Sequence, residues 1–114
     1  MIASEIRAVL TDPRIGIPTY QFDAPEDAPY PHTVYTYISD RGSVYSEGDE
    51  DTQLSEVQVM IYHKSNYNPI LLKVLEVAKE HGFYKGLGFG RKDRDLNIYY
   101  YTIRLSKEIE NGSN

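Results

Sequence analysis

The stretch TQLSEVQVMIYHKSNYNPILLKVLEVAKEHG, residues 52–82, decides the fold of this chain. In its first half, three β-branched apolar residues alternate with Glu56, Gln58, Met60 and Tyr62. These three residues are Val57, Val59 and Ile61. Successive side chains of a strand point to opposite faces of a sheet, so this alternation predicts a strand at 52–63.

The second half of the stretch has the spacing of an amphipathic helix. Asn68 is a favoured N-cap residue, and the proline that follows it is tolerated in the first helical turn. Gly82 supplies the left-handed residue that often ends a helix. We therefore expect a helix that begins at Asn68-Pro69, ends at His81-Gly82 and buries a stripe of Leu71, Val74, Leu75 and Ala78.

The residues at the N-terminus predict a short helix and a first strand. Apolar residues at spacings of three and four predict a helix at 2–11. Pro13 ends it, because the residue before a proline avoids helical angles. Residues 16–22 then favour a strand, in which Pro18 marks a sheet edge or a strand start.

A hairpin with a long connection is expected between this strand and the main helix. Residues 23–31 are rich in proline and acids and predict a loop. Residues 32–39 alternate as a second strand, which we expect to pair with 52–63. A turn opening at 40–42 and a charged loop at 46–51 would connect the two strands.

After the helix, the sequence predicts two more strands. The first covers 83–89 and is interrupted by glycines, which in strands mark bulges or close backbone approach. A turn at 91–95 and a long strand at 96–105 follow. The order α-β-β-β-α-β-β predicts an α+β fold with a mostly antiparallel sheet of four to five strands and two helices. We expect one domain at 1–105 and a frayed polar tail at 106–114.

Composition excludes several functional classes. The chain has 114 residues, a net charge of −5 and no cysteine, which excludes disulfides and thiolate metal sites. Its acidic balance argues against sequence-specific nucleic-acid binding, which needs clustered Lys and Arg. No apolar run is long enough to span a membrane, and the N-terminus lacks a secretion signal, so we expect a soluble protein made in the cytoplasm.

Both faces of the predicted sheet are apolar, although two helices cover only one. A half-solvated antiparallel strand should carry one polar face, yet 96–105 carries apolar side chains on both. The chain also has 11 tyrosines, a residue that suits surfaces buried in an assembly. We therefore expect a subunit interface formed by Tyr35, Tyr37, Met60, Tyr62, Tyr99 and Tyr101. The alternative is that a loop folds over this face, or that the tyrosines keep their hydroxyls in water.

No catalytic, metal or cofactor site is recognisable in the sequence. The three histidines are dispersed, and no pairing with His or Asp suggests a metal site. Gly86-Leu87-Gly88-Phe89-Gly90 follows a helix and opens no helix, unlike a phosphate-binding loop. Asp49-Glu50-Asp51 lacks the spaced ligands of a calcium loop. We expect a protein that is not an enzyme.

Several landmarks follow one another in a recognisable order along the chain. The short N-terminal helix is followed by the extended segment Ile17–Phe22 and by the proline- and tyrosine-containing entry to a strand, Ala28–Tyr35. The strand Val57–Tyr62 then leads through Ser65-Asn66-Tyr67-Asn68 into the main helix, and the last strand ends with Tyr101–Leu105. This pattern resembles the tail terminator or tail completion proteins of long-tailed phages, which include the tail-to-head joining proteins.

The resemblance implies a structural virion protein of a phage or prophage. It would form a ring, typically of six subunits, at the head-proximal end of the tail tube. Its partners would be sister copies, the tail tube protein and the head connector or adaptor protein, with DNA passing through the lumen. The loop with Glu47, Asp49, Glu50 and Asp51 is then a candidate for the lumen or for contact between rings.

Two other functions remain open on the sequence. One is a ferredoxin-like ligand-binding or regulatory domain that dimerises through its sheet. The other is a small hydrolase that uses Asp49, Glu50 and a histidine.

Overall fold

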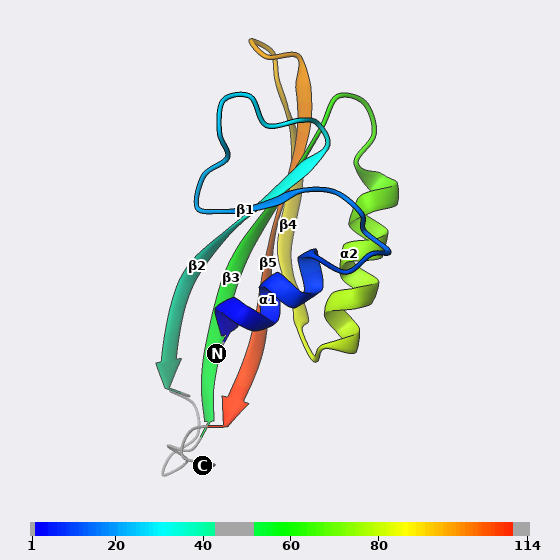
Figure 1. Ribbon diagram of the computed structural model, residues 1–114. Helices are drawn as coiled ribbons and strands as arrows, with labels where there is room; N and C mark the ends of the chain where they lie inside the picture. The colour runs from blue at the N-terminus through cyan, green and yellow to red at the C-terminus, as the bar shows by residue number, and fades with distance from the viewer. Residues whose placement is uncertain (1, 43–51, 111–114) are drawn as a thin grey trace.

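The computed structural model describes residues 2–42 and 52–110, which form two helices against one five-stranded sheet (Figure 1). The elements are α1 (Ile2–Leu10), β1 (Thr19–Gln21), β2 (His32–Gly42), β3 (Thr52–His63), α2 (Asn68–Glu80), β4 (Tyr84–Asp93) and β5 (Ile98–Glu110). The predicted α+β class and the order α-β-β-β-α-β-β are both confirmed.

The strands lie in the order β1-β2-β3-β5-β4. β1 pairs with β2 in parallel, and the other three pairs are antiparallel, so the sheet is mostly antiparallel as predicted. β2 and β3 form the predicted hairpin, and β1 is an edge strand. Since β3 and β4 are both antiparallel to β5, they run parallel to each other, and α2 makes the crossover between them.

This topology differs from the ferredoxin-like alternative. A ferredoxin-like domain has the order β-α-β-β-α-β, in which each helix joins two strands. Within residues 2–42 and 52–110, α1 precedes all strands, and only α2 is a crossover. The domain therefore contains one split β-α-β unit rather than two.

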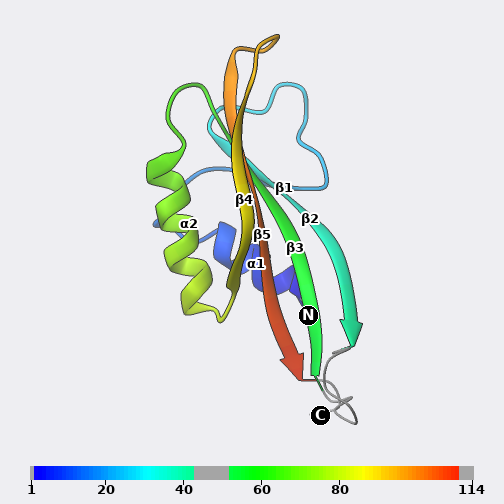
Figure 2. The same ribbon diagram turned by 180° about the vertical axis from the view of Figure 1, so that it is seen from behind.

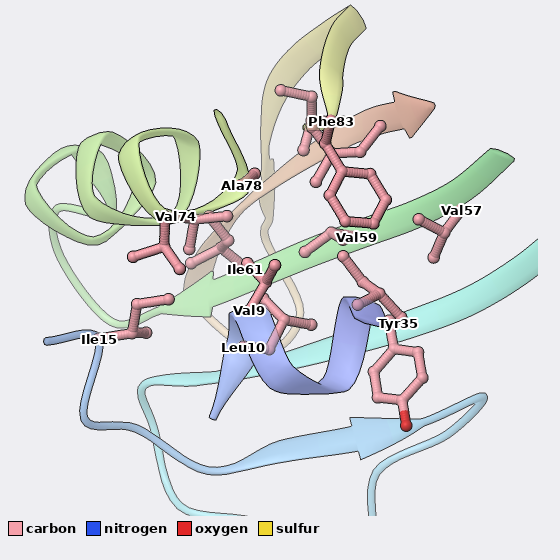
Figure 3. Close-up of a cluster of buried hydrophobic side chains, with 14 of the residues drawn as sticks. Val9, Leu10, Ile15, Tyr35, Val57, Val59, Ile61, Val74, Ala78 and Phe83 are labelled. Atoms are coloured by element: carbon pink, nitrogen blue, oxygen red, sulfur yellow. The ribbon is translucent and has the colours of Figure 1, made fainter. Parts of the chain in front are cut away.

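Both helices pack on the same face of the sheet (Figures 1 and 2). The apolar spacing of α1 places Ile6, Val9 and Leu10 towards the strands, each at most 1% exposed. Figure 3 shows Val9 and Leu10 pointing towards Ile61 of β3. The centre of the core consists of Val57, Val59, Ile61, Val74, Val77, Ile103 and Leu105.

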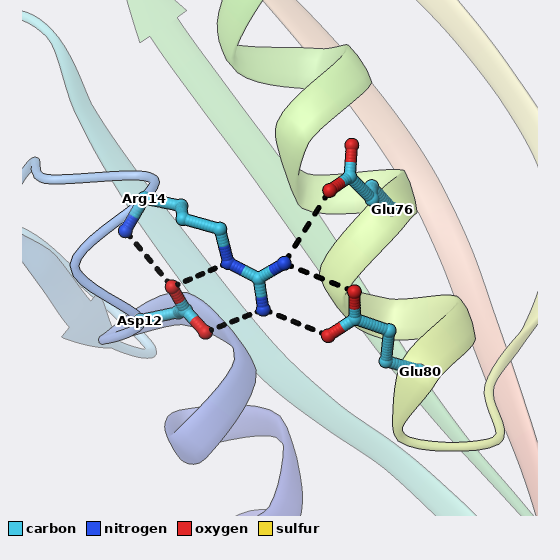
Figure 4. Close-up of polar contacts among 4 residues, drawn as sticks. All are labelled: Asp12, Arg14, Glu76 and Glu80. Carbon is cyan, nitrogen blue, oxygen red and sulfur yellow. Dashed lines mark hydrogen bonds and ion pairs between the residues drawn. The ribbon is translucent and has the colours of Figure 1, made fainter.

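A cluster of charged side chains joins the turn after α1 to the last turns of α2 (Figure 4). The Arg14 guanidinium lies 3.0 Å from a carboxylate oxygen of Asp12 and 2.7 Å from one of Glu80, with Glu76 at 3.3 Å. Hydrogen bonds from the Arg14 side chain and backbone lower the pKa of Asp12 to about 2. The same guanidinium lowers the pKa of Glu80 and has its own pKa raised. These ion pairs tether two elements that are distant in sequence.

In the N-terminal half, three boundaries differ from the predictions. α1 ends at Leu10, and β1 covers only Thr19–Gln21. Two residues of the predicted strand are left-handed, Gly16 at φ 66° and Phe22, directly after β1, at φ 69°. β2 continues through Gly42, where we expected a turn at 40–42, because the start of β3 offers it a pairing partner. The predicted charged loop at 46–51 lies outside the described residues.

The main helix begins and packs slightly differently from the prediction. Tyr67 occupies the N-cap position without a side-chain hydrogen bond, so Asn68 is the first helical residue instead of the cap. Asn66 accepts a hydrogen bond from the Asn68 N–H at 3.0 Å. We expected Leu75 in the buried stripe of this helix, but it is only half-buried, and Val77 is fully buried instead. The predicted end holds, since Gly82 is left-handed at φ 86°.

The last two strands are longer than predicted and are shifted along the chain. β4 runs to Asp93, whose carboxylate accepts hydrogen bonds from the N–H groups of Asp95 and Leu96, and this moves the turn to 94–97. β5 continues through Glu110 by pairing with the first residues of β3, so 106–110 is a strand and not the expected frayed tail. The remaining tail residues, 111–114, lie outside the described part of the chain.

Candidate assembly surface

The face of the sheet opposite the helices, which we call the outer face, is only partly covered by the chain itself. Along β3, the residues that alternate with the buried Val57, Val59 and Ile61 point to it, namely Glu56, Gln58, Met60 and Tyr62. Their cross-strand partners on β2, β5 and β4 share this face. Figure 2 views the sheet from this side, where neither of the two described helices covers it.

A row of aromatic rings crosses one end of the outer face. Tyr30 lies 5.0 Å from His32 between ring centroids, His32 stacks on Tyr62 at 5.0 Å, and Tyr62 lies 5.7 Å from Tyr100. The last three are direct cross-strand neighbours on β2, β3 and β5. Burial raises the pKa of the Tyr62 phenol, and the neighbouring Tyr100 adds to this. The row binds the connection before β2 to the sheet.

The connection from β1 to β2 lies over this same end, as the alternative interpretation anticipated for a loop. His32 is 4% exposed, and its Nδ1 donates a hydrogen bond to the Pro29 carbonyl at 2.8 Å. The connection and the sheet line a groove of about 580 Å³. It is lined by residues that include Phe22, Glu26, Tyr30, Met60, Tyr62 and Ile98.

The outer face along β4 remains open to solvent. Leu87 is 82% exposed and Phe89 45% exposed. Together with Gln58, Thr102 and Arg104 they line a shallow hollow of about 260 Å³. We call Leu87, Phe89, Arg91 and Arg104 the β4 patch. Exposed apolar side chains grouped in this way are typical of an interaction site.

The six residues predicted for a subunit interface are divided between the two faces. Met60 and Tyr62 lie on the outer face, where the Tyr62 hydroxyl donates to the Met60 sulfur at 3.5 Å. Tyr35 is only 3% exposed and belongs to the core, with its hydroxyl accepting a hydrogen bond from Arg7 at 3.5 Å. Tyr35 therefore has almost no surface to offer a partner.

The other three predicted tyrosines also lie on the helix side. Tyr37 and Tyr101 are partly buried and pack against the core, and Tyr101 lies 5.4 Å from the ring of Tyr67. Tyr99 is half-buried on the same face as Tyr101, with the Lys92 ammonium 5.2 Å from its ring centroid. The periodicity grouped residues correctly along each strand but did not show which face the helices cover.

Sequence reasoning missed two exposed apolar residues of β4, Leu87 and Phe89. The glycines around them hid the alternation of β4. A register shift between Lys85 and Gly88 shows that the strand contains a bulge. Leu87 and Phe89 are two residues apart and line the same hollow on the outer face. The prediction that these glycines mark bulges or close backbone approach is confirmed, and the apolar residues between them were the signal available for the patch.

Two of the three histidines make local contacts at the ends of elements. His63 accepts the Ser65 N–H at 2.9 Å, and His81 occupies the C-cap of α2, so both have local structural roles. Within 2–42 and 52–110, no group of three or more His, Cys, Asp or Glu is placed to hold a metal ion. None of the helices in this described part is long and apolar enough to cross a membrane. The predicted loop residues lie outside the described residues, namely Glu47, Asp49, Glu50 and Asp51. The hydrolase alternative depends on Asp49 and Glu50, so its site also falls outside the described part of the chain.

Comparison with known proteins gives a likeness to solved structures. No known protein family matches the sequence, and no curated protein matches it either. Among solved structures, the fold is similar to a chain of "Virion of native gene transfer agent (GTA) particle", at 10% sequence identity and a TM-score of 0.56. The similarity covers 96% of this chain and 91% of that chain. At this level of identity the likeness concerns the fold.

Proposed function

We propose that this chain is a structural protein of a phage-like virion that acts as a tail terminator or tail completion protein. It forms a ring, a hexamer in this proposal, at the head-proximal end of the tail tube and joins the tail to the head connector or adaptor. It works by surface complementarity and not by catalysis. It is made in the cytoplasm of the host bacterium and ends in the virion.

The observation that carries this proposal is the open outer face of the sheet combined with the fold likeness. The fold matches a virion chain over 96% of this chain and 91% of that chain. Leu87 and Phe89 on the outer face are the kind of surface that is buried when subunits assemble. The order of landmarks that resembles the tail completion family agrees with both.

Deleting the gene from its phage or prophage tests the role directly. The expected result is a fall in infectious titre of several orders of magnitude, with headless tails of uncontrolled length in negative-stain images. Supplying the protein in trans should restore joined particles. Joined virions with tails of normal length in the deletion strain would overturn the proposal. A ring of uniform diameter formed by the purified protein would support it.

A further inference from the structure

The β4 patch combines exposed apolar surface with positive charge. Leu87 and Phe89 project beside the exposed side chains of Arg91 and Arg104. Arg91 lies over the Phe89 ring, at 5.1 Å from its centroid. A partner for this patch must offer apolar surface accompanied by carboxylates.

The chain carries a surface of that description on the β1–β2 connection. Phe22 is 61% exposed and is held in the left-handed region at φ 69°, with its N–H donated to the Tyr35 carbonyl at 2.8 Å. Asp23, Glu26 and Asp27 follow it, all exposed, and no Lys or Arg occurs in residues 22–31. We call residues 22–27 the acidic connection.

The two surfaces lie towards opposite edges of the sheet. The acidic connection leaves the sheet on the side of β1, whereas β4 forms the other edge, and both views agree on this (Figures 1 and 2). Pairing either surface with its own copy would bring like charges together, which opposes a two-fold interface. Pairing one surface with the other brings opposite charges together and leaves the resulting pair of subunits with one free surface of each kind.

We propose that the acidic connection of one subunit docks on the β4 patch of the next, so that copies of this chain associate head to tail. Such a heterologous contact closes into a ring when the rotation between subunits allows it. The inference rests on the proposed function for its ring, and it adds which two surfaces make the contact. Phe22 fills the hollow beside Leu87 and Phe89, and the carboxylates meet Arg91 and Arg104.

Charge reversal tests the contact with a built-in rescue. Arg91→Glu with Arg104→Glu makes both surfaces acidic, and Asp23→Lys with Glu26→Lys makes both basic. Each variant alone should associate at least about tenfold more weakly than the natural chain in sedimentation, because like charges then face each other. An equimolar mixture should recover association in alternating order. Lys73→Glu with Lys79→Glu changes the same amount of charge on α2 and should have little effect.

A cross-linking experiment keeps the test valid even where the free protein associates weakly. The chain has no cysteine, so Glu26→Cys and Leu87→Cys each introduce one unique thiol. Under mild oxidation, the mixture of the two variants should give several times more disulfide-linked dimer than either variant alone. Equal yields from the mixture and from the single variants would overturn the head-to-tail contact, as would a charge-reversed mixture that associates no better than its components.

These outcomes separate the contact from the virion role. Mixed cross-links together with normal virions in the deletion strain would support the contact and overturn the tail function. Defective tails in the deletion strain, complemented equally well by both charge-reversed variants, would support the tail function and overturn the contact.

Discussion

Glycines allow two tyrosines to lie directly against β4. A Cβ atom on Gly88 would lie 2.5 Å from the Tyr101 hydroxyl, and one on Gly90 would overlap the Tyr67 hydroxyl. Tyr67 and Tyr101 pack against each other and against the core. At the residue scale, these glycines are therefore required by side-chain packing, since neither has a positive φ.

Gly90→Ala should accordingly lower the free energy of unfolding by about 1–3 kcal/mol, the usual cost of overpacking a filled site. Removing the hydroxyl in Tyr67→Phe should make the same Gly90→Ala change less costly, although the ring carbon at 3.0 Å still limits the relief. Urea unfolding of the four proteins in this double-mutant cycle measures the coupling. An equal effect of Gly90→Ala in both backgrounds would show that the Tyr67 hydroxyl is not the obstacle.

At the scale of elements, the contact between α1 and α2 depends in part on the Arg14 ion pairs. Asp12 has a pKa of about 2 in the folded chain, below its ordinary value of 3.8, and the pKa of Glu80 is also lowered. A carboxylate whose pKa falls on folding stabilises the protein at pH values above its unfolded pKa. This stabilisation is lost as the pH falls through the folded pKa, here between about pH 5 and pH 2.

Arg14→Gln should therefore flatten the acid side of the stability curve. The melting temperature of the natural chain should fall further between pH 7 and pH 2.5 than that of the variant. The reason is that the variant lacks the guanidinium that lowers the pKa values of Asp12 and Glu80. Lys73→Gln, which removes one positive charge from the exposed side of α2, should keep the steep dependence. Parallel curves for the natural chain and Arg14→Gln would contradict this assignment. At neutral pH, 1 M salt should reduce the difference in melting temperature between the two proteins, because salt screens the ion pairs.

At the scale of the whole molecule, the two faces of the sheet have different tasks. The helix side holds the core, including Tyr35 and the partly buried Tyr101. The outer face is covered by the β1–β2 connection at one end and open along β4 at the other. Substitutions on the two faces should therefore separate stability from assembly.

Leu87→Asp with Phe89→Asp should leave the melting temperature nearly unchanged and abolish assembly, because both side chains are exposed in the single subunit. Tyr101→Asp should instead lower the free energy of unfolding by about 2–4 kcal/mol, since it removes ring packing and brings a charge against the core. Thermal melts and sedimentation distinguish the two effects. Unfolding of the β4 double variant, or full stability of Tyr101→Asp, would reverse the assignment of the faces.

The sequence by itself determined the class of the fold, the element order and the mostly antiparallel sheet. Local patterns sufficed for this: strict alternation in 52–63, helical spacing with Gly82 at its end, and glycines at a bulge. Boundaries were predicted less well, because β2 and β5 are extended by pairing with the ends of β3, and a local window contains no information about a partner strand.

Only the tertiary structure decided which side of the sheet is free. Strand periodicity places Tyr35 and Tyr37 together and Met60 and Tyr62 together, but it does not relate one strand's faces to those of another or to the helices. That relation follows from register and from where α1 and α2 pack, which are set by contacts between distant residues. It assigned Tyr35 to the core and revealed Leu87 and Phe89 as the open surface, because burial is a property of the assembled chain and not of any segment.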